Sequence, residues 1–291
     1  MNLVKTMNNI KGVVHLLNIE SRQVLLSKPG IGPKRVEKIL TLRSDCMKDG
    51  GSMSLRDAMD AKAITPSLLA KLTGDENAPF VIKYVELYCQ SFHDVCQIPS
   101  NLLSLDLGIH NAAYVLMDTD YTVREWKRLD LGMPSPYNPE ECFRKVKESL
   151  GQFPPADLYV IEEQSHRNPS NRGFLNISVQ LRVLEAMVLA VSKLTSLSPV
   201  HSLSPNRVSR YFGTNGKSGA AAKKKMSIEF ATKMIETLNP MKTPLGNTIK
   251  VPQDLVKYFE KEKKKDDLSD CLLQAAAVVD WCKMTQKLNY N

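Results

Sequence analysis

Apolar residues change their spacing along the chain, and this change divides it into two regions. Up to about residue 75 they recur at helical intervals in short segments separated by turn residues. From about residue 100 they form continuous or alternating runs typical of strands, with longer helical segments between them. The pattern predicts a small all-α module, a linker helix over residues 76–100 and an α/β domain over residues 101–291.

The second region is predicted to contain five strands. LLSLDLGI, AAYVLMD and TVREWKRLDLG follow one another directly, whereas ADLYVIEEQ and VHSLSP come later. Helices are expected over NPEECFRKVKESL, within residues 175–194, over residues 226–238 and from Asp267 to about Leu288. This order predicts a mixed sheet flanked by helices. Residues 240–265 contain three prolines and a charged run, so a long loop is expected there.

The helical module, residues 16–75, contains the turn Pro29-Gly30-Ile31-Gly32. Glycine permits positive φ and close approach to a ligand, and the helix that follows offers unpaired N–H groups. The expected ligand is a DNA phosphate, and the residues expected to bind it are Gly30, Gly32, Lys34, Arg35 and Lys38. The alternative is a plain helical turn. The segment resembles a helix-hairpin-helix motif, and residues 50–72 resemble a second copy whose turn has no glycine, so packing is expected of it instead.

The amino-acid composition indicates which binding partners and which cellular compartment to expect. The chain of 291 residues has 39 Lys and Arg against 31 Asp and Glu, a formal charge of +8 that favours a polyanion. No apolar run is long enough to span a membrane, so no membrane partner is expected. The six cysteines have no CxxC spacing, which indicates a reducing compartment. Residues 1–15 are basic and lack acids, as expected of either an organellar targeting segment or an ordinary first helix.

Several acids occur within or at the end of segments that are predicted to be buried strands. Asp106 lies inside the first strand, and the apolar run YVIEEQ ends on Glu162 and Glu163. A buried carboxylate is costly unless it meets donors or a cation. A third group, Asp266, Asp267 and Asp270, opens the last helix, where spacings of three and four let either pair share a face. These last acids are equally typical of a solvated first turn.

Three or four carboxylates brought together would repel one another unless divalent cations lay between them. Hard oxygen donors suit Mg2+ or Mn2+. Two such ions in one site activate water and stabilise the leaving oxygen of a phosphodiester. The acids therefore form a candidate site for such cations, unless those of the last helix are only its solvated first turn.

The motifs SLDLGIHNAAY, VIEEQSHRN and KKDDLSDCLLQAAAVV resemble, in order and context, the RuvC-like branch of the ribonuclease H fold. They are most similar to the fungal mitochondrial cruciform-cutting endonucleases, a family of Holliday junction resolvases, over residues 101–284. The resemblance implies a ribonuclease H-like domain, two Mg2+ or Mn2+ ions per site, a homodimer and a four-way DNA junction as substrate. It also implies a mitochondrial location; otherwise another reducing, DNA-containing compartment is expected.

Carried over by position, the resemblance assigns catalysis and metal binding to Asp106, Glu162, Asp267 and Asp270, with Asp266 as the alternative in the last helix. Gln164 and Arg167 match the IE-x-Q-x-x-R run of this family and are expected to bind DNA, and Lys223, Lys224 and Lys225 are expected to line DNA arms. Two departures, His110 and Glu163, replace residues that are usually basic. His110 is either a donor beside the site or a structural residue.

The expected function is a metal-dependent endonuclease that resolves four-way junctions by symmetric paired nicks. The rivals are another ribonuclease H-fold nuclease acting on RNA–DNA hybrids or flaps, and a non-catalytic DNA-architectural protein with a decayed nuclease fold. An actin-like ATP-binding fold shares the DLG strand, but no second phosphate loop is apparent.

Overall fold

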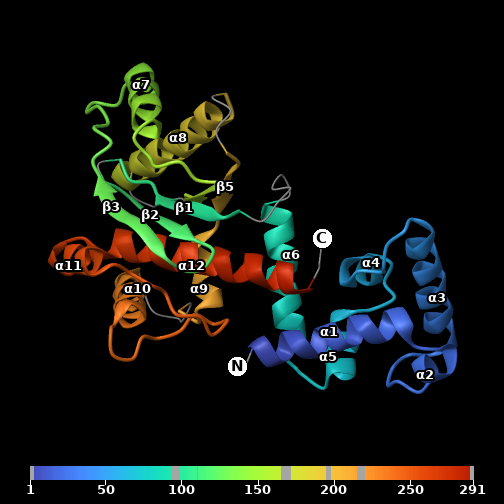
Figure 1. Ribbon diagram of the computed structural model, residues 1–291. Coiled ribbons are helices and arrows are strands. Elements are labelled where there is room, and N and C mark those ends of the chain that lie inside the picture. The colour runs from blue at the N-terminus through green and yellow to red at the C-terminus, as the bar shows by residue number, and fades with distance from the viewer. Residues whose placement is uncertain are drawn as a thin grey trace. The chain divides into compact units, whose positions relative to one another are not determined.

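The computed structural model describes residues 3–92, 99–109, 111–164, 172–194, 198–214 and 220–288 (Figure 1). The chain forms two compact units. The first comprises Met1–Gln90, Pro244–Gly246 and Asp280–Asn291, and the second comprises Ser91–Thr243 and Asn247–Val279. None of the described helices combines the length and apolar character needed to cross a bilayer.

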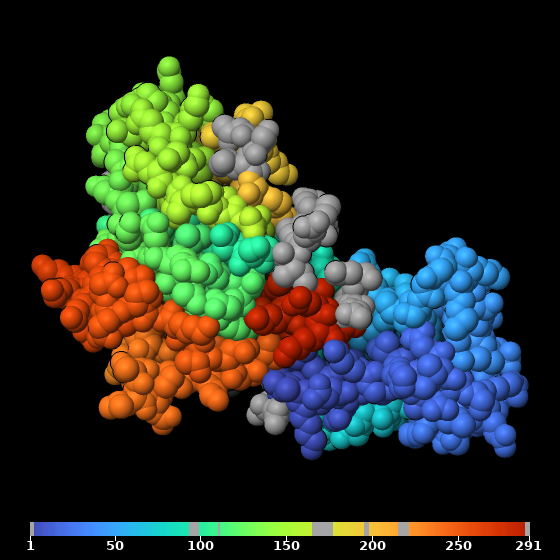
Figure 2. Space-filling model, viewed as in Figure 1, coloured from blue at the N-terminus to red at the C-terminus, as the bar shows by residue number. Residues whose placement is uncertain are grey.

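The first unit is helical. Its elements are α1 (Leu3–Ile19), α2 (Arg22–Leu26), α3 (Pro33–Lys48), α4 (Leu55–Asp60), α5 (Pro66–Thr73), α6 (Ala78–Ser91) and the end of α12 (Lys265–Leu288). Short helices of this kind depend on their caps. Ser54 and Asp57 form a capping box at α4, and Thr65 caps α5. In the space-filling view, α1 to α3 form a continuous blue surface (Figure 2).

Two distant segments join this helical unit through specific contacts. Trp281 of α12 stacks on Tyr84 of α6 with ring centroids 5.4 Å apart. Asp280, which is fully buried, accepts a hydrogen bond of 3.1 Å from the backbone N–H of Leu245. The unit is therefore completed by residues from the far end of the chain.

The second unit is built on one mixed sheet of order β3-β2-β1-β4-β5. Its strands are β1 (Asn101–Asp106), β2 (Ala112–Asp118), β3 (Val123–Leu129), β4 (Leu158–Glu162) and β5 (Val200–Leu203). β1, β2 and β3 are antiparallel neighbours, whereas β4 is parallel to β1 and β5 is parallel to β4. The mixed sheet predicted from the sequence is confirmed.

Helices cover both faces of this sheet (Figure 1). They are α7 (Pro139–Leu150), α8 (Arg172–Leu194), α9 (Pro205–Tyr211), α10 (Ala220–Ile235), α11 (Gln253–Lys261) and α12. On one face, Leu105 and Ile161 belong to a core that includes Val146 of α7 and Val188 of α8. On the other face, the indole N–H of Trp126 donates to the carbonyl of Leu268 in α12 at 3.0 Å.

The prediction of one long loop over residues 240–265 is wrong, because α11 lies inside it. Val256 and Phe259, three residues apart, are buried, and Phe259 stacks on Trp126 with ring centroids 4.7 Å apart. The three prolines fall outside the helix, and Pro252 directly precedes it, where a missing N–H costs nothing. α10 begins at Ala220 and ends at Ile235, both earlier than predicted, and α12 begins at Lys265.

Candidate active site and nucleic-acid interface

Two acids meet at the carboxyl ends of neighbouring parallel strands. The last register pair of β1 and β4 is Leu105 with Ile161, and Asp106 and Glu162 follow these residues directly. Because they hold equivalent positions after the same pair, their side chains lie on the same face of the sheet. Both are partly exposed at the sheet edge.

The acids of α12 are brought to this edge by contacts within the second unit. The thiol of Cys271 donates to the carbonyl of Ala113 in β2 at 3.0 Å, and β2 pairs Ala113 with Asp106. Asp270 precedes Cys271, and Asp266 and Asp267 lie one turn earlier. The fold therefore brings all the predicted acids into electrostatic range of one another.

This crowding changes how the acids titrate. Burial, together with the charges of Asp270, Asp267 and Asp266, raises the pKa of Asp106 to about 8. Burial and the nearby Asp106 raise the pKa of Glu162 well above its ordinary value. Burial also raises the pKa of Asp270, although Ser227 and Lys223 oppose this. Acids whose pKa values are shifted by burial and by specific charged neighbours mark a candidate functional site.

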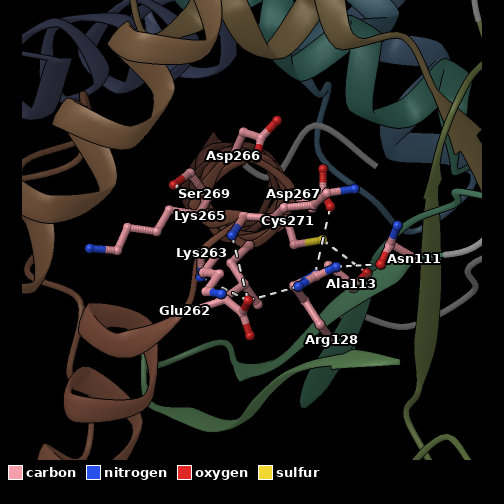
Figure 3. A network of polar contacts seen from close by, with 12 residues as sticks. Asn111, Ala113, Arg128, Glu262, Lys263, Lys265, Asp266, Asp267, Ser269 and Cys271 are labelled. Carbon is pink, nitrogen blue, oxygen red and sulfur yellow. Dashed lines mark hydrogen bonds and ion pairs between the residues drawn. The ribbon is translucent and has the colours of Figure 1, made fainter. Parts of the chain in front are cut away.

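The first-turn acids of α12 have cationic partners, and Figure 3 shows that of Asp267. Asp266 is 2.5 Å from the ammonium of Lys224; burial alone would raise the pKa of Asp266, but this contact holds it below its ordinary value. Asp267 is 3.7 Å from the guanidinium Nε of Arg128. Burial and Asp266 raise the pKa of Asp267, while Arg128 opposes the rise.

Arg128 of β3 contacts several polar residues near the start of α12 (Figure 3). Its Nη1 donates to Glu262 at 2.7 Å, and its Nη2 donates to the side-chain oxygen of Asn111. Glu262 also accepts the backbone N–H of Lys263 at 2.9 Å. Only 17% of the Arg128 side chain is exposed. Arg128 and Glu262 were missed from the sequence, although strand alternation places Arg128 on the same face as the buried Trp126.

The chemical type of the candidate ligand atoms suits a divalent cation. All the candidate ligands are carboxylate oxygens, which hard cations prefer, and their mutual repulsion is what such a cation relieves. In the described part of the chain, however, no three acids, histidines or cysteines are grouped closely enough to hold a metal ion. A small cavity between these elements is lined by Glu162, Asp270, Lys223 and Gln274. Gln274 is buried, and its Nε2 has no hydrogen-bond partner within the described ranges.

Gln164, predicted to bind DNA, turns its side chain inward. Its Nε2 donates to the carbonyl oxygens of Leu107 at 3.4 Å and Glu162 at 3.2 Å. Its backbone N–H donates to Glu185 of α8 at 3.1 Å. The predicted DNA residue Arg167 and the candidate donor His110 lie outside the described residues.

The helical module brings four of the predicted DNA residues to one hollow. Gly32, Lys34, Arg35 and Lys38 line it, together with Lys62 from the turn after α4. Lys62 was not predicted to bind DNA. It belongs to the second hairpin, which has no glycine in its turn, so both hairpins contribute residues to the same hollow. Arg35 also donates to the carbonyl of Gly30 at 2.7 Å. Only Gly30 has the expected positive φ, +79°, since Gly32 is extended with φ of −91°.

The comparisons with known proteins agree with this fold. The sequence model of the family described as mitochondrial resolvase Ydc2 / RNA splicing MRS1 matches residues 102–288. The crystal structure of the yeast mitochondrial Holliday junction resolvase Ydc2 is 18% identical with a TM-score of 0.50, and the match covers 71% of this chain and 93% of that one. Thermus thermophilus RuvC is 14% identical with a TM-score of 0.35, over 61% and 93% of the two chains. The likeness to the Ydc2 structure confirms the predicted fold, a mixed sheet flanked by helices.

A curated relative differs in its described role. The mitochondrial transcription elongation factor of Danio rerio is 27% identical over 194 residues, which are 61% of this chain and 50% of the relative. The chain therefore spans about half the length of the curated relative it matches.

Proposed function

The chain belongs to the mitochondrial resolvase Ydc2 / RNA splicing MRS1 family, and from this premise we propose that it is a metal-dependent endonuclease that resolves four-way DNA junctions. The observation that carries the proposal is the acid cluster. Asp106, Glu162 and Asp270 come from three elements far apart in sequence. Burial raises the pKa of all three, and the charge of Asp270 adds to the rise at Asp106 and at Glu162. Strongly shifted acids that converge in this way are typical of a functional site.

Asp106, Glu162 and Asp270, with Asp267 or Asp266, would hold two Mg2+ or Mn2+ ions. Bound there, the ions supply an activated water and neutralise charge on the leaving oxygen. The chain's own residues bind and orient the substrate: Lys223 and Lys224 lie beside the acids and present positive charge to the phosphate backbone.

Resolution of a junction needs two cuts, and each active site makes one. A two-fold homodimer presents two identical sites to opposed strands, so we include a homodimer in the proposal. The names of the family and of the elongation factor both place those proteins in mitochondria, and we propose the same location here.

A second candidate function is binding of nucleic acid without cleavage. Two observations favour it: the curated relative is named a transcription elongation factor, and the described acids are not grouped as metal ligands. In that case the ribonuclease H-like domain would serve as a binding scaffold.

The deciding experiment incubates the protein with a synthetic four-way junction, its linear duplex and an RNA–DNA hybrid, each with Mg2+. Paired nicks in the junction are expected. Asp106→Asn and Glu162→Gln should abolish cutting while junction binding persists, because the basic surface is unchanged. The control is Asp254→Asn, an exposed acid of α11. Cutting of the hybrid alone would favour another nuclease, and tight binding without any cutting would favour the second candidate.

A companion series separates the acids of α12. Asp270→Asn should abolish cutting. Asp267→Asn should also abolish it if Asp267 is the second ligand. Asp266→Asn should then leave cutting intact and affect stability only, through the lost charge contact with Lys224 and a helix-terminus contribution of about 0.3–1 kcal/mol. An inactive Asp266 variant beside an active Asp267 variant would reverse this assignment.

A further inference from the structure

The two strand acids lie just beyond the last register pair of β1 and β4, although Asp106 still pairs with Ala113 of β2 and Glu162 with Leu203 of β5. The register of β1 and β4 ends at Leu105 and Ile161, and the carboxylates of Asp106 and Glu162 come immediately after. The two carboxylates are on the same face of the sheet, and like charges oppose close approach. A direct contact between the ends of β1 and β4 would therefore fix the separation of the two acids.

The side chain of Gln164 supplies such a contact. Its Nε2 donates to Leu107, directly after Asp106, and to the carbonyl of Glu162. One carboxamide therefore bridges the ends of β1 and β4. The orientation of the amide is fixed, because the opposite one would place its oxygen against two carbonyl oxygens.

Gln164 is held in turn by Glu185 of α8, a carboxylate of which only 8% is exposed. Its Oε2 accepts the backbone N–H of Gln164 at 3.1 Å, and its Oε1 accepts the hydroxyl of Ser202 in β5 at 2.6 Å. Both oxygens are thus used by neighbours of the site. A buried acid is costly unless such bonds stabilise it.

We propose that Gln164 and Glu185 are positioning residues that set the separation of Asp106 and Glu162 and so their affinity for the divalent cation. The inference rests on the proposed metal-dependent function and assigns Gln164 a role other than the DNA contact expected from the sequence. The two hypotheses differ in what a substitution changes. Removal of a DNA-binding group weakens junction binding, whereas removal of the bridge weakens metal binding.

The test uses Gln164→Met in the full chain, which keeps length and charge but removes the donor. Calorimetric titration with Mn2+ should show affinity reduced at least about tenfold, as is typical when a group that orients metal ligands is removed. Glu185→Gln, which keeps one acceptor oxygen, should show a smaller loss in the same direction. Gln180→Met of α8 is the matched control and should bind Mn2+ as the wild type does. Junction binding in EDTA should be unchanged in all three.

Hydrogen–deuterium exchange without metal provides a second readout. Exchange in residues 104–109 and 158–164 should speed up in Gln164→Met and not in Gln180→Met. Unchanged Mn2+ affinity and exchange, or reduced junction binding in EDTA, would overturn the proposal. If the wild type binds no Mn2+, the proposed nuclease function fails, and the exchange measurement alone still decides whether Gln164 holds the strand ends.

Discussion

Gly30 has a φ of +79°, and a β-carbon added to it would lie 2.8 Å from Cδ1 of Leu68, whereas Gly32 is extended and has open space at that position. Gly30 is therefore needed by the fold of the hairpins. Gly32 is free of that constraint. The lack of a side chain at this position is therefore an advantage only if a ligand from outside the module approaches the backbone.

Substitution of these two glycines separates stability from binding. Gly30→Ala should lower the free energy of unfolding by about 1–2 kcal/mol, because the left-handed region disfavours a β-carbon. Gly32→Thr keeps an adequate N-cap for α3, so stability should hold while affinity for duplex DNA falls. Denaturant unfolding and fluorescence anisotropy measure the two effects. Equal DNA affinity of Gly32→Thr and wild type would show that no phosphate binds at this turn.

The carboxyl of Asp106 predicts how stability depends on pH. Its pKa is about 8 in the fold, against an ordinary value of 3.8. Between these values the unfolded chain loses the proton and the folded one keeps it. Asp106 should therefore make the free energy of unfolding of the metal-free protein fall as pH rises from about 4 to 8, and its own contribution is at most about 1.4 kcal/mol per pH unit.

Asp106→Asn should flatten this fall, and Mn2+ should oppose it in the wild type only. Urea unfolding at pH 5 and pH 8 in EDTA, repeated with Mn2+, measures both effects. Asp254→Asn serves as the control and should follow the wild type. An Asp106 variant with the wild-type pH dependence would mean that this carboxyl is not crowded by the others.

At the scale of elements, β3 holds the start of α12 through Arg128. Arg128→Leu would leave Glu262 and Asp267 without their cation, so the free energy of unfolding should fall by about 1.5–3 kcal/mol. Arg128→Lys keeps the charge but not the planar fork and should lose less. Urea unfolding measures the loss.

Arg124 provides a control on the same strand. It pairs with Asp118 at 2.6 Å, but 60% of its side chain is exposed. Arg124→Leu should therefore cost no more than about 1 kcal/mol. Equal losses at the two positions would contradict a special role for Arg128.

At the scale of the whole molecule, basic residues of the helical module are expected to bind DNA that the acids of the second unit cut. Deleting the module is a poor test, because Tyr84 and Trp281 stack within the first unit and a truncation would disturb it. Point substitutions avoid this difficulty.

Lys34→Gln, Lys38→Gln and Lys62→Gln, combined, should weaken junction binding. They should also flatten the slope of log affinity against log salt by about 0.9 for each duplex phosphate that the protein no longer neutralises. Cleavage at low salt should persist, since all the acids lie beyond residue 100. The control is Lys71→Gln of α5, which lies outside the hollow. An unchanged slope would mean that the module is structural or binds a protein.

The sequence by itself determined the strands and the acids Asp106 and Glu162 at strand ends. It also determined the two helical hairpins, one with glycines in its turn and one without. These features depend on local spacing and burial, which neighbouring residues encode. Only the tertiary structure decided the partners of polar side chains. Arg128 meets Glu262 across 134 positions, and Gln164 meets Leu107 across 57. α11 also needed tertiary contacts, because Phe259 is stabilised by Trp126 on another element. Such pairings depend on which elements the fold places side by side, and local spacing does not specify that.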